Sequence, residues 1–481
     1  MSVSVQFLSH VPSALRRLSC MPRLHSGRMA LLLASALFTA PAAGQTIAIS
    51  GGTVAIGDGS EPIPGGTVLI REGRVVAAGA NVAVPAGTRV IDATGKWVTP
   101  GLIAGFSRLG LADVDAVEGS NDIAANGPFS AALDIGPSVN PNALPVAVNR
   151  ADGVTRAIVA PAVGRSIFAG QGALIDTGAD LDPVTRPRLF QFVELGEEGA
   201  SESGGSRAST HVLLRSALRE AAELSRFAAP IRGGGQRLRP GVPENPNDPK
   251  LLTPQAKRSD DVLLTRFDAA ALVPVLRGQQ ILMVHVNRST DLLQVIALKR
   301  EFPNLRLVIV GADEGWMVAD RLAASRIPVI ASALSNLPGS FESLAATQSN
   351  VGRMREAGVN VSIGTINDDE TRMLSRARFY AGNLVGLAKV PGASGLAWGE
   401  ALRMVTSAPA EAVGLGAEVG SLQPGRRGDV VVWSGDPLDN ASAAELVLID
   451  GVQQPLENRQ TKLRDRYKDL QRRELPEAYR R

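Results

Sequence analysis

The stretch that decides the fold is Val98-Thr99-Pro100-Gly101-Leu102-Ile103-Ala104-Gly105-Phe106-Ser107-Arg108. Its Pro-Gly pair predicts a corner after a loop, and the apolar residues that follow predict a short strand. This strand ends in three unlike side chains: the ring of Phe106, the hydroxyl of Ser107 and the guanidinium of Arg108. The patterns on either side of the strand indicate the fold in which it lies.

Before this strand the chain has the pattern of β structure, and after it short buried strands alternate with helices. The early β-branched runs are at 46–50, 66–70, 75–79 and 90–93. Later strands are expected at 155–160, 280–285, 305–310, 328–331 and 359–363, and helices at 289–302, 315–325, 340–357 and 399–406. The β pattern returns at 419–422, 429–433 and 444–450.

Alternation of strands and helices with short loops is typical of a parallel sheet with helical crossovers. Repeated over about 300 residues, it favours a (β/α)8 barrel over an open doubly wound sheet. The sequence thus predicts an α/β protein, with a (β/α)8 barrel and a small β-sandwich formed by both chain ends. The expected segments are a signal peptide at 1–44, sandwich parts at 45–98 and 409–456, the barrel at 99–408 and a charged C-terminal helix at 457–481.

The first 44 residues have the features of a secretory signal peptide. Arg23 and Arg28 precede an apolar run at 29–40, and small residues follow up to Gly44. This order predicts export, to the periplasm. Weaker alternatives are a twin-arginine signal, lipid attachment and a later start codon, at Arg16-Arg17, Cys20 and Met21 respectively.

Composition argues against several classes of function. The formal net charge of +3 gives no overall attraction to polyanions, no nucleic-acid motif occurs, and no later stretch is long and apolar enough to span a membrane. Acids and bases alternate in the C-terminal tail, which indicates a solvated helix face rather than a nucleic-acid or lipid patch. The Gly- and Pro-rich residues 233–258 predict a long loop, either a lid over the barrel mouth or a loop on its flank.

Seven segments, in the right order, carry a resemblance to a known family. They are Ile49-Ser50-Gly51-Gly52-Thr53, Pro100-Gly101-Leu102-Ile103, Gly153-Val154-Thr155-Arg156-Ala157, Gly170-Gln171-Gly172-Ala173, Val284-His285, Ser407-Ala408-Pro409-Ala410 and Gly420-Ser421-Leu422-Gln423-Pro424-Gly425. The chain resembles exported, imidazolonepropionase-like members of the amidohydrolase superfamily over nearly its whole mature length. The resemblance implies hydrolysis of carbon–nitrogen bonds other than peptide bonds, with divalent metal (zinc or similar) at the barrel mouth.

Most metal ligands that the resemblance implies are missing. The family uses two histidines on strand one, a lysine or glutamate on strand four, a histidine each on strands five and six, and an aspartate on strand eight. The corresponding residues here are Phe106 and Arg108 on strand one, His285 on strand five, Gly311 on strand six and Ile366 on strand eight. No strand-four ligand can be assigned from the sequence. His285 is the retained family ligand, and no confident metal site is predicted.

Few histidines are available for a rearranged site. His10 and His25 lie in the predicted signal peptide, and His211, at the start of a helix, is expected to be structural or exposed. His285 is either a general base or ligand-contacting group at the mouth, or a hydrogen-bonded core residue. An oxygen-rich site for a harder cation would draw on Asp313, Glu314, Asp368 and Asp369.

Arg108 places a fixed positive charge near the expected metal position. Its planar guanidinium stays ionised and could hold a ligand carboxylate at the barrel mouth. The other reading is that Arg108 pairs with a local acid, such as Asp313 or Asp368, and fills the vacated space.

The sequence therefore leaves two functions open. The first is an amidohydrolase-like protein whose catalysis is impaired by the lost ligands, with any remaining activity resting on His285 and Asp368. The alternative is a non-catalytic exported binding or partner subunit. It would bind a small molecule, form a homo-oligomer or associate with an intact amidohydrolase.

Overall fold

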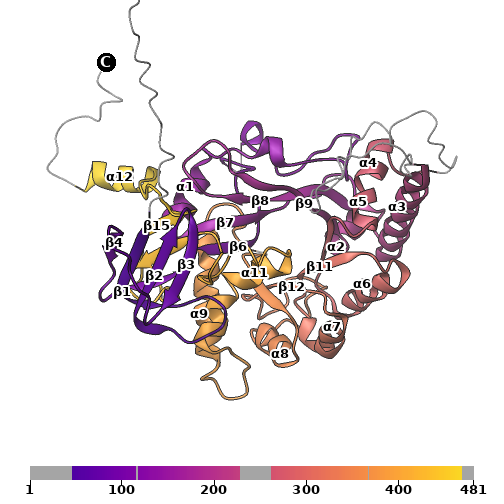
Figure 1. Ribbon diagram of the computed structural model, residues 1–481. Coiled ribbons are helices and arrows are strands. Elements are labelled where there is room, and N and C mark those ends of the chain that lie inside the picture. Colours follow the sequence, from indigo (N-terminus) through magenta and orange to yellow (C-terminus); the bar gives the residue numbers. More distant parts are fainter. Residues whose placement is uncertain (1–45, 115–116, 228–261, 367, 469–481) are drawn as a thin grey trace, which may run out of the picture. The chain divides into compact units, whose positions relative to one another are not determined.

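The computed structural model describes residues 46–114, 117–227, 262–366 and 368–468 (Figure 1). The predicted signal peptide at 1–44, the Pro-rich segment 233–258 and the end of the predicted C-terminal helix lie outside the described residues. Among the helices that the structure describes, none has the length and apolar character needed to cross a membrane.

The barrel is an eight-stranded sheet whose strands follow one another in sequence order. They are β6 (Leu102–Ser107), β7 (Val154–Val159), β8 (Phe168–Asp176), β9 (Val184–Glu194), β10 (Ile281–Val286), β11 (Arg306–Gly311), β12 (Val329–Ser332) and β13 (Val361–Gly364). Neighbouring strands are parallel, except that β8 is antiparallel to both β7 and β9. The predicted barrel is confirmed, with one reversed strand that the sequence pattern does not reveal.

Helices connect the barrel strands (Figure 1). The crossovers between β10 and β13 use α6 (Ser289–Glu301), α7 (Ala319–Ser325) and α8 (Asn350–Glu356). The other α-helices are α1 (Leu144–Ala151), α2 (Glu197–Glu202), α3 (Arg207–Phe227), α4 (Arg266–Ala271), α5 (Val273–Leu276), α9 (Ala377–Leu387), α10 (Trp398–Arg403), α11 (Ser407–Ala412) and α12 (Arg459–Tyr467). Short 3-10 helices are η1 (Glu118–Ser120), η2 (Gly136–Ser138), η3 (Gly315–Val318) and η4 (Leu374–Arg376).

Side chains on β6 divide between the barrel interior and the layer beneath the helices. Ile103 and Phe106 pack in the interior cluster, and Leu102 packs in the larger cluster outside it. Gly105 lets β6 approach β13, because a Cβ atom there would lie 2.8 Å from the carbonyl oxygen of Ile363. This close approach brings the first and last strands together and nearly closes the barrel.

Both chain ends build the second sheet. Its path is β16-β15-β14-β5-β1-β2-β3, and β4 pairs with β1. The strands are β1 (Ile47–Val54), β2 (Ile63–Arg71), β3 (Arg74–Gly79), β4 (Arg89–Asp92), β5 (Trp97–Pro100), β14 (Val430–Trp433), β15 (Ala444–Ile449) and β16 (Val452–Gln453). Antiparallel pairing of β5 with β14 joins the two chain ends in one continuous sheet with its own apolar cluster.

Arg156 ties this sheet to the barrel. Its fully buried side chain on β7 lies 2.8 Å from Asp429, 3.0 Å from Asp450 and 3.5 Å from Asp176. A buried guanidinium needs such partners, since an unpaired charge in the interior is strongly unfavourable. Arg156 therefore holds the residue before β14 and the residue after β15 against the barrel wall.

Three predicted elements differ from the structure. Residues 419–422 form no strand, because Gly420 turns with φ +95° and packs closely on the backbone of Ser407. The helix expected at 340–357 is confined to α8, since the hydroxyls of Ser340 and Ser343 bond to each other at 3.1 Å and form a local turn instead. The helix expected at 399–406 ends at Arg403.

Candidate functional site

A cavity of about 700 Å³, called here the mouth cavity, lies at the C-terminal ends of the barrel strands. Strands β9 to β13 and the loops that follow them supply its walls. Its lining includes Glu194, His285, Asn287, Asp313, Glu342 and Ile366. Barrels of this type place their functional residues at this face, and the volume suits a small molecule.

An aromatic ring and a guanidinium occupy the strand-one positions. The ring of Phe106 is buried, and its centroid lies 5.4 Å from that of Phe192 on β9. The guanidinium carbon of Arg108 lies 4.9 Å from the Phe106 centroid and 5.5 Å from the Phe192 centroid. Arg108 thus makes cation–π contacts with both rings, and the three side chains form one stack at the inner wall.

The polar atoms of Arg108 are engaged within the protein. Its Nη1 donates to carbonyl oxygens that follow β7, including that of Ala160 at 2.8 Å, and its Nε lies 3.3 Å from Glu370. Burial lowers the pKa of Arg108, and the charge of Glu370 acts in the opposite direction. The acid partner is therefore Glu370 rather than Asp313 or Asp368, and the side chain is only 12% exposed.

Glu194 and His285 form the central pair of the mouth cavity. Glu194 ends β9, lies in register with His285 on β10, and its Oε2 is 2.7 Å from His285 Nδ1. Burial lowers the pKa of His285, but the charge and hydrogen bond of Glu194 outweigh it and raise the pKa to about 9. His285 is therefore an imidazolium at neutral pH. Its Nε2 has no hydrogen-bond partner among the described residues.

Gly311 leaves open the space beside His285. It ends β11 with φ +95°, a conformation that side chains other than glycine rarely adopt. A Cβ atom at this position would lie 2.3 Å from Asn287 Oδ1 and 3.0 Å from His285 Nε2. The strand-six histidine that the resemblance implies could not stand here beside His285 and Asn287.

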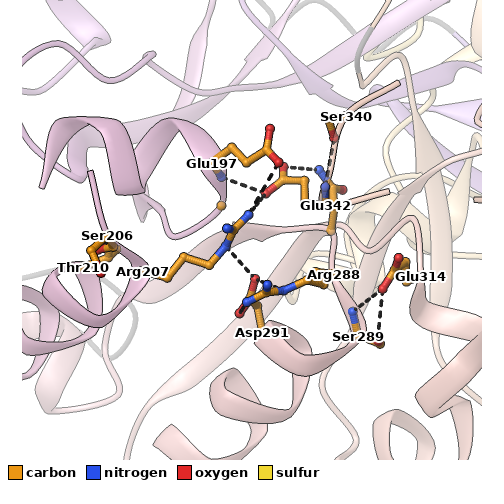
Figure 2. Close-up of polar contacts among 12 residues, drawn as sticks. Glu197, Ser206, Arg207, Thr210, Arg288, Ser289, Asp291, Glu314, Ser340 and Glu342 are labelled. Atoms are coloured by element: carbon orange, nitrogen blue, oxygen red, sulfur yellow. Dashed lines mark hydrogen bonds and ion pairs between the residues drawn. The ribbon is translucent and has the colours of Figure 1, made fainter. Parts of the chain in front are cut away.

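Arg207, at the start of α3, forms ion pairs with acidic residues at and beside the cavity (Figure 2). It lies 3.2 Å from Glu342 and 3.1 Å from Asp291. Glu342 also accepts hydrogen bonds from the backbone N–H of Glu197 at 2.7 Å and from Nδ2 of Asn287 at 2.9 Å. These bonds fix the amide orientation of Asn287, so that its Oδ1 atom faces the space above Gly311.

Asp313 and Glu314, adjacent in sequence, have separate roles. Asp313 lines the mouth cavity, burial raises its pKa, and its Oδ1 has no hydrogen-bond partner among the described residues. Glu314 accepts from the N–H and the hydroxyl of Ser289 at 2.9 and 3.0 Å, and from the N–H of Ala345 at 3.1 Å. Glu314 therefore binds the first residue of α6 and does not line the cavity.

Asp368 is not among the residues that line the cavity with His285. Its carboxylate lies 3.2 Å from Arg376 and accepts a hydrogen bond from the hydroxyl of Tyr380. Burial and this bond raise the pKa of Tyr380. Asp369 pairs with Arg372 at 3.4 Å instead. The four acids considered for a harder cation are thus divided among separate networks.

The residues present do not fit the divalent metal that the resemblance implies. Catalytic zinc sites use three protein ligands and leave one position open. Within the ranges that the structure describes, no group of three His, Cys, Asp or Glu residues could hold a metal ion. Glu194 and His285 bond to each other, Gly311 excludes a side chain, and Phe106 offers no donor atom.

The sequence analysis found His285 and Gly311 but missed Glu194, Asn287 and the Arg207–Glu342 pair. Glu194 had a usable signal, since it is the acid that follows the mostly apolar residues 189–193 at the end of a strand. The Arg207–Glu342 pair spans 135 residues and has no local sequence signal.

Comparisons with known proteins agree with this fold. The profile of the Amidohydrolase family matches residues 284–458. Amidohydrolase tasK of Hapsidospora irregularis is 23% identical over 400 residues, which cover 77% of this chain and 38% of the relative. The chain thus spans well under half the length of that protein. The crystal structure of an amidohydrolase from Thermotoga maritima MSB8 superposes with a TM-score of 0.69 at 24% identity, covering 85% of this chain and 99% of that chain.

The barrel, its flanking sheet and these similarities place the chain among proteins with the amidohydrolase fold. More narrowly, the similarity to the Amidohydrolase family profile covers residues 284–458, from β10 to the end of the second sheet. The imidazolonepropionase-like subgroup stays a prediction.

Proposed function

We propose that this chain is an exported amidohydrolase-fold protein that binds a small molecule in the mouth cavity and has strongly impaired hydrolysis of carbon–nitrogen bonds. The observation that supports this most directly is that Phe106 and Arg108 occupy the strand-one positions and pack against Phe192 of β9. It puts an aromatic ring and a permanently charged guanidinium where the resemblance expects two metal-binding histidines.

The acid–base properties of the cavity support the proposal. A hydrolase needs a group that activates water, supplied either by a metal or by a general base. His285 is protonated below a pKa of about 9, so it cannot accept a proton from water at neutral pH. Asp368, the acid predicted to assist it, pairs with Arg376 away from the cavity lining. What His285 can do is donate a hydrogen bond from Nε2 into the cavity.

The test is hydrolysis of chromogenic amides by the mature chain, with and without added zinc or manganese. We expect turnover no higher than that of the heat-denatured chain under every condition. Metal-dependent turnover that a chelator abolishes, and that Glu194→Gln also removes, would overturn the proposal. Detection of the chain in the periplasmic fraction tests the proposed export separately.

A further inference from the structure

The charges that line the mouth cavity do not balance. Five carboxylates line it, those of Glu194, Glu197, Glu198, Asp313 and Glu342. Glu194 pairs with His285, while Glu342 and Glu197 lie 3.2 and 3.8 Å from Arg207. Glu198 and Asp313 form no ion pair with any residue that the structure describes. The cavity therefore presents an excess of negative charge that would attract a cation.

Two deeply buried oxygen atoms at the floor of the cavity have no hydrogen-bond donor. Asp313 is 3% exposed and Asn287 is 4% exposed, and both line the cavity. Their Oδ1 atoms have no partner among the described residues. The Asn287 oxygen is an acceptor independent of the acids, since its Nδ2 is used by Glu342. Buried acceptors are normally satisfied, so these atoms indicate a ligand that donates hydrogen bonds.

The rim of the same cavity is apolar. Leu334 and Leu337 line it and are 45% and 78% exposed, and the buried side chain of Ile366 continues the surface inward. A ligand that fills the cavity would therefore meet oxygen acceptors at the floor and aliphatic side chains at the rim.

We propose that the mouth cavity binds an amphipathic primary amine, whose ammonium group donates to Asp313 and Asn287 and whose apolar chain lies against Leu334 and Leu337. An ammonium group has three donors, which match the unpartnered oxygen atoms of Asp313 and Asn287, and it leaves the Nε2–H of His285 to a water molecule. A carboxylate ligand would face unpaired acids. A metal ion would need the three-residue ligand group that the described residues lack. Burial raises the pKa of Asp313, and a bound ammonium would lower it again.

This inference rests on the proposed binding function and gives it a ligand class. The test is calorimetric titration of the full chain at pH 7 with butylamine, hexylamine and octylamine, and with hexanoate and hexanol as matched probes. We expect the amines to bind, with about fourfold tighter binding for each methylene that leaves water. Hexanoate or hexanol binding as tightly as hexylamine would overturn the ligand class.

The variant Asp313→Asn should weaken hexylamine binding by at least about tenfold, because it removes a buried charge partner. Asp320→Asn, an exposed change of equal charge on α7, is the matched control and should bind as the natural chain does. If Asp313→Asn fails to fold, Glu198→Gln at the exposed rim should still weaken binding roughly threefold. Amine binding that neither Asp313→Asn nor Glu198→Gln weakens would refute the proposal.

Failure of this inference is distinguishable from failure of the proposed function. The same samples are tested for amide hydrolysis. A chain that binds amines and also hydrolyses amides supports the ligand class and contradicts the loss of catalysis. A chain that binds no amine overturns the ligand class, whatever its hydrolytic result.

Discussion

The pair of Glu194 and His285 sets the protonation state of the mouth cavity, and Glu194→Gln tests it with little change of shape. Burial alone would lower the pKa of His285 below its ordinary value of 6.5, and Glu194, with smaller contributions from Glu342 and Glu370, raises it to about 9. The net rise corresponds to about 3 kcal/mol of stabilisation of the protonated imidazole in the folded chain. Without the charge of Glu194, we expect the pKa of His285 to fall to about 6.5 or below, because burial then opposes protonation.

A pH titration of the histidine ring protons by nuclear magnetic resonance measures the pKa of His285 directly. His211 is an internal reference: burial lowers its pKa, whereas the pKa of His285 is raised, so the two signals should titrate in different pH ranges. The variant His285→Gln removes the ring signal of His285 and thereby assigns it. The reasoning is refuted if His285 of the natural chain titrates near 6.5, or if Glu194→Gln leaves its midpoint unchanged.

Stability should follow the same pair. The folded chain holds the His285 proton more tightly than the unfolded chain, so the stabilisation is complete below pH 6.5 and is lost as the pH rises through about 9. In urea unfolding, the natural chain should therefore exceed Glu194→Gln by about 3 kcal/mol at pH 6, and the two should converge above pH 9. A constant difference across this range would contradict the assignment.

Three further substitutions test other parts of the structure. Arg156→Met should lower the free energy of unfolding in urea by about 3–5 kcal/mol, because it leaves buried acids unpaired; Arg71→Met, exposed on β2, should change it by less than about 0.5 kcal/mol, and equal losses would contradict the role of Arg156. Gly311→Ala should lower the melting temperature more than Gly65→Ala, since both glycines have positive φ but a Cβ atom meets other atoms only at Gly311. Arg108→Met should destabilise the chain, and small carboxylates should shift the melting temperature of neither form; a shift in the natural chain alone would show that Arg108 binds anions.

The barrel was predictable because its evidence is local. Most of the barrel strands are short, largely apolar runs, and the Pro-Gly corner before Leu102 marks the first of them, whereas β8 and β9 were not predicted. The reversal of β8 was not predictable, since a buried strand has the same apolar composition in either direction. The helix expected at 340–357 is absent over 340–349 for a different reason: serine side chains there bond to their neighbours, and the resulting loop carries Glu342 to the cavity.

Residues of the candidate site were predictable only where the end of a single strand is enough to place them. Phe106, His285 and Gly311 each lie at the end of a recognisable strand, so the missing ligands could be inferred position by position. The Glu194–His285 pair depends on the register between β9 and β10, and the position of Arg207 depends on where α3 packs. Contacts of this kind are set by the fold rather than by neighbouring residues.

The metal content of the purified chain tests the central claim most directly. The chain is produced with zinc, manganese and iron supplied, dialysed without chelator and measured by plasma mass spectrometry. The structure predicts far less than one metal ion per chain, with no change in His285→Ala. One zinc, manganese or iron ion per chain, lost in His285→Ala and removed by a chelator, would contradict the account.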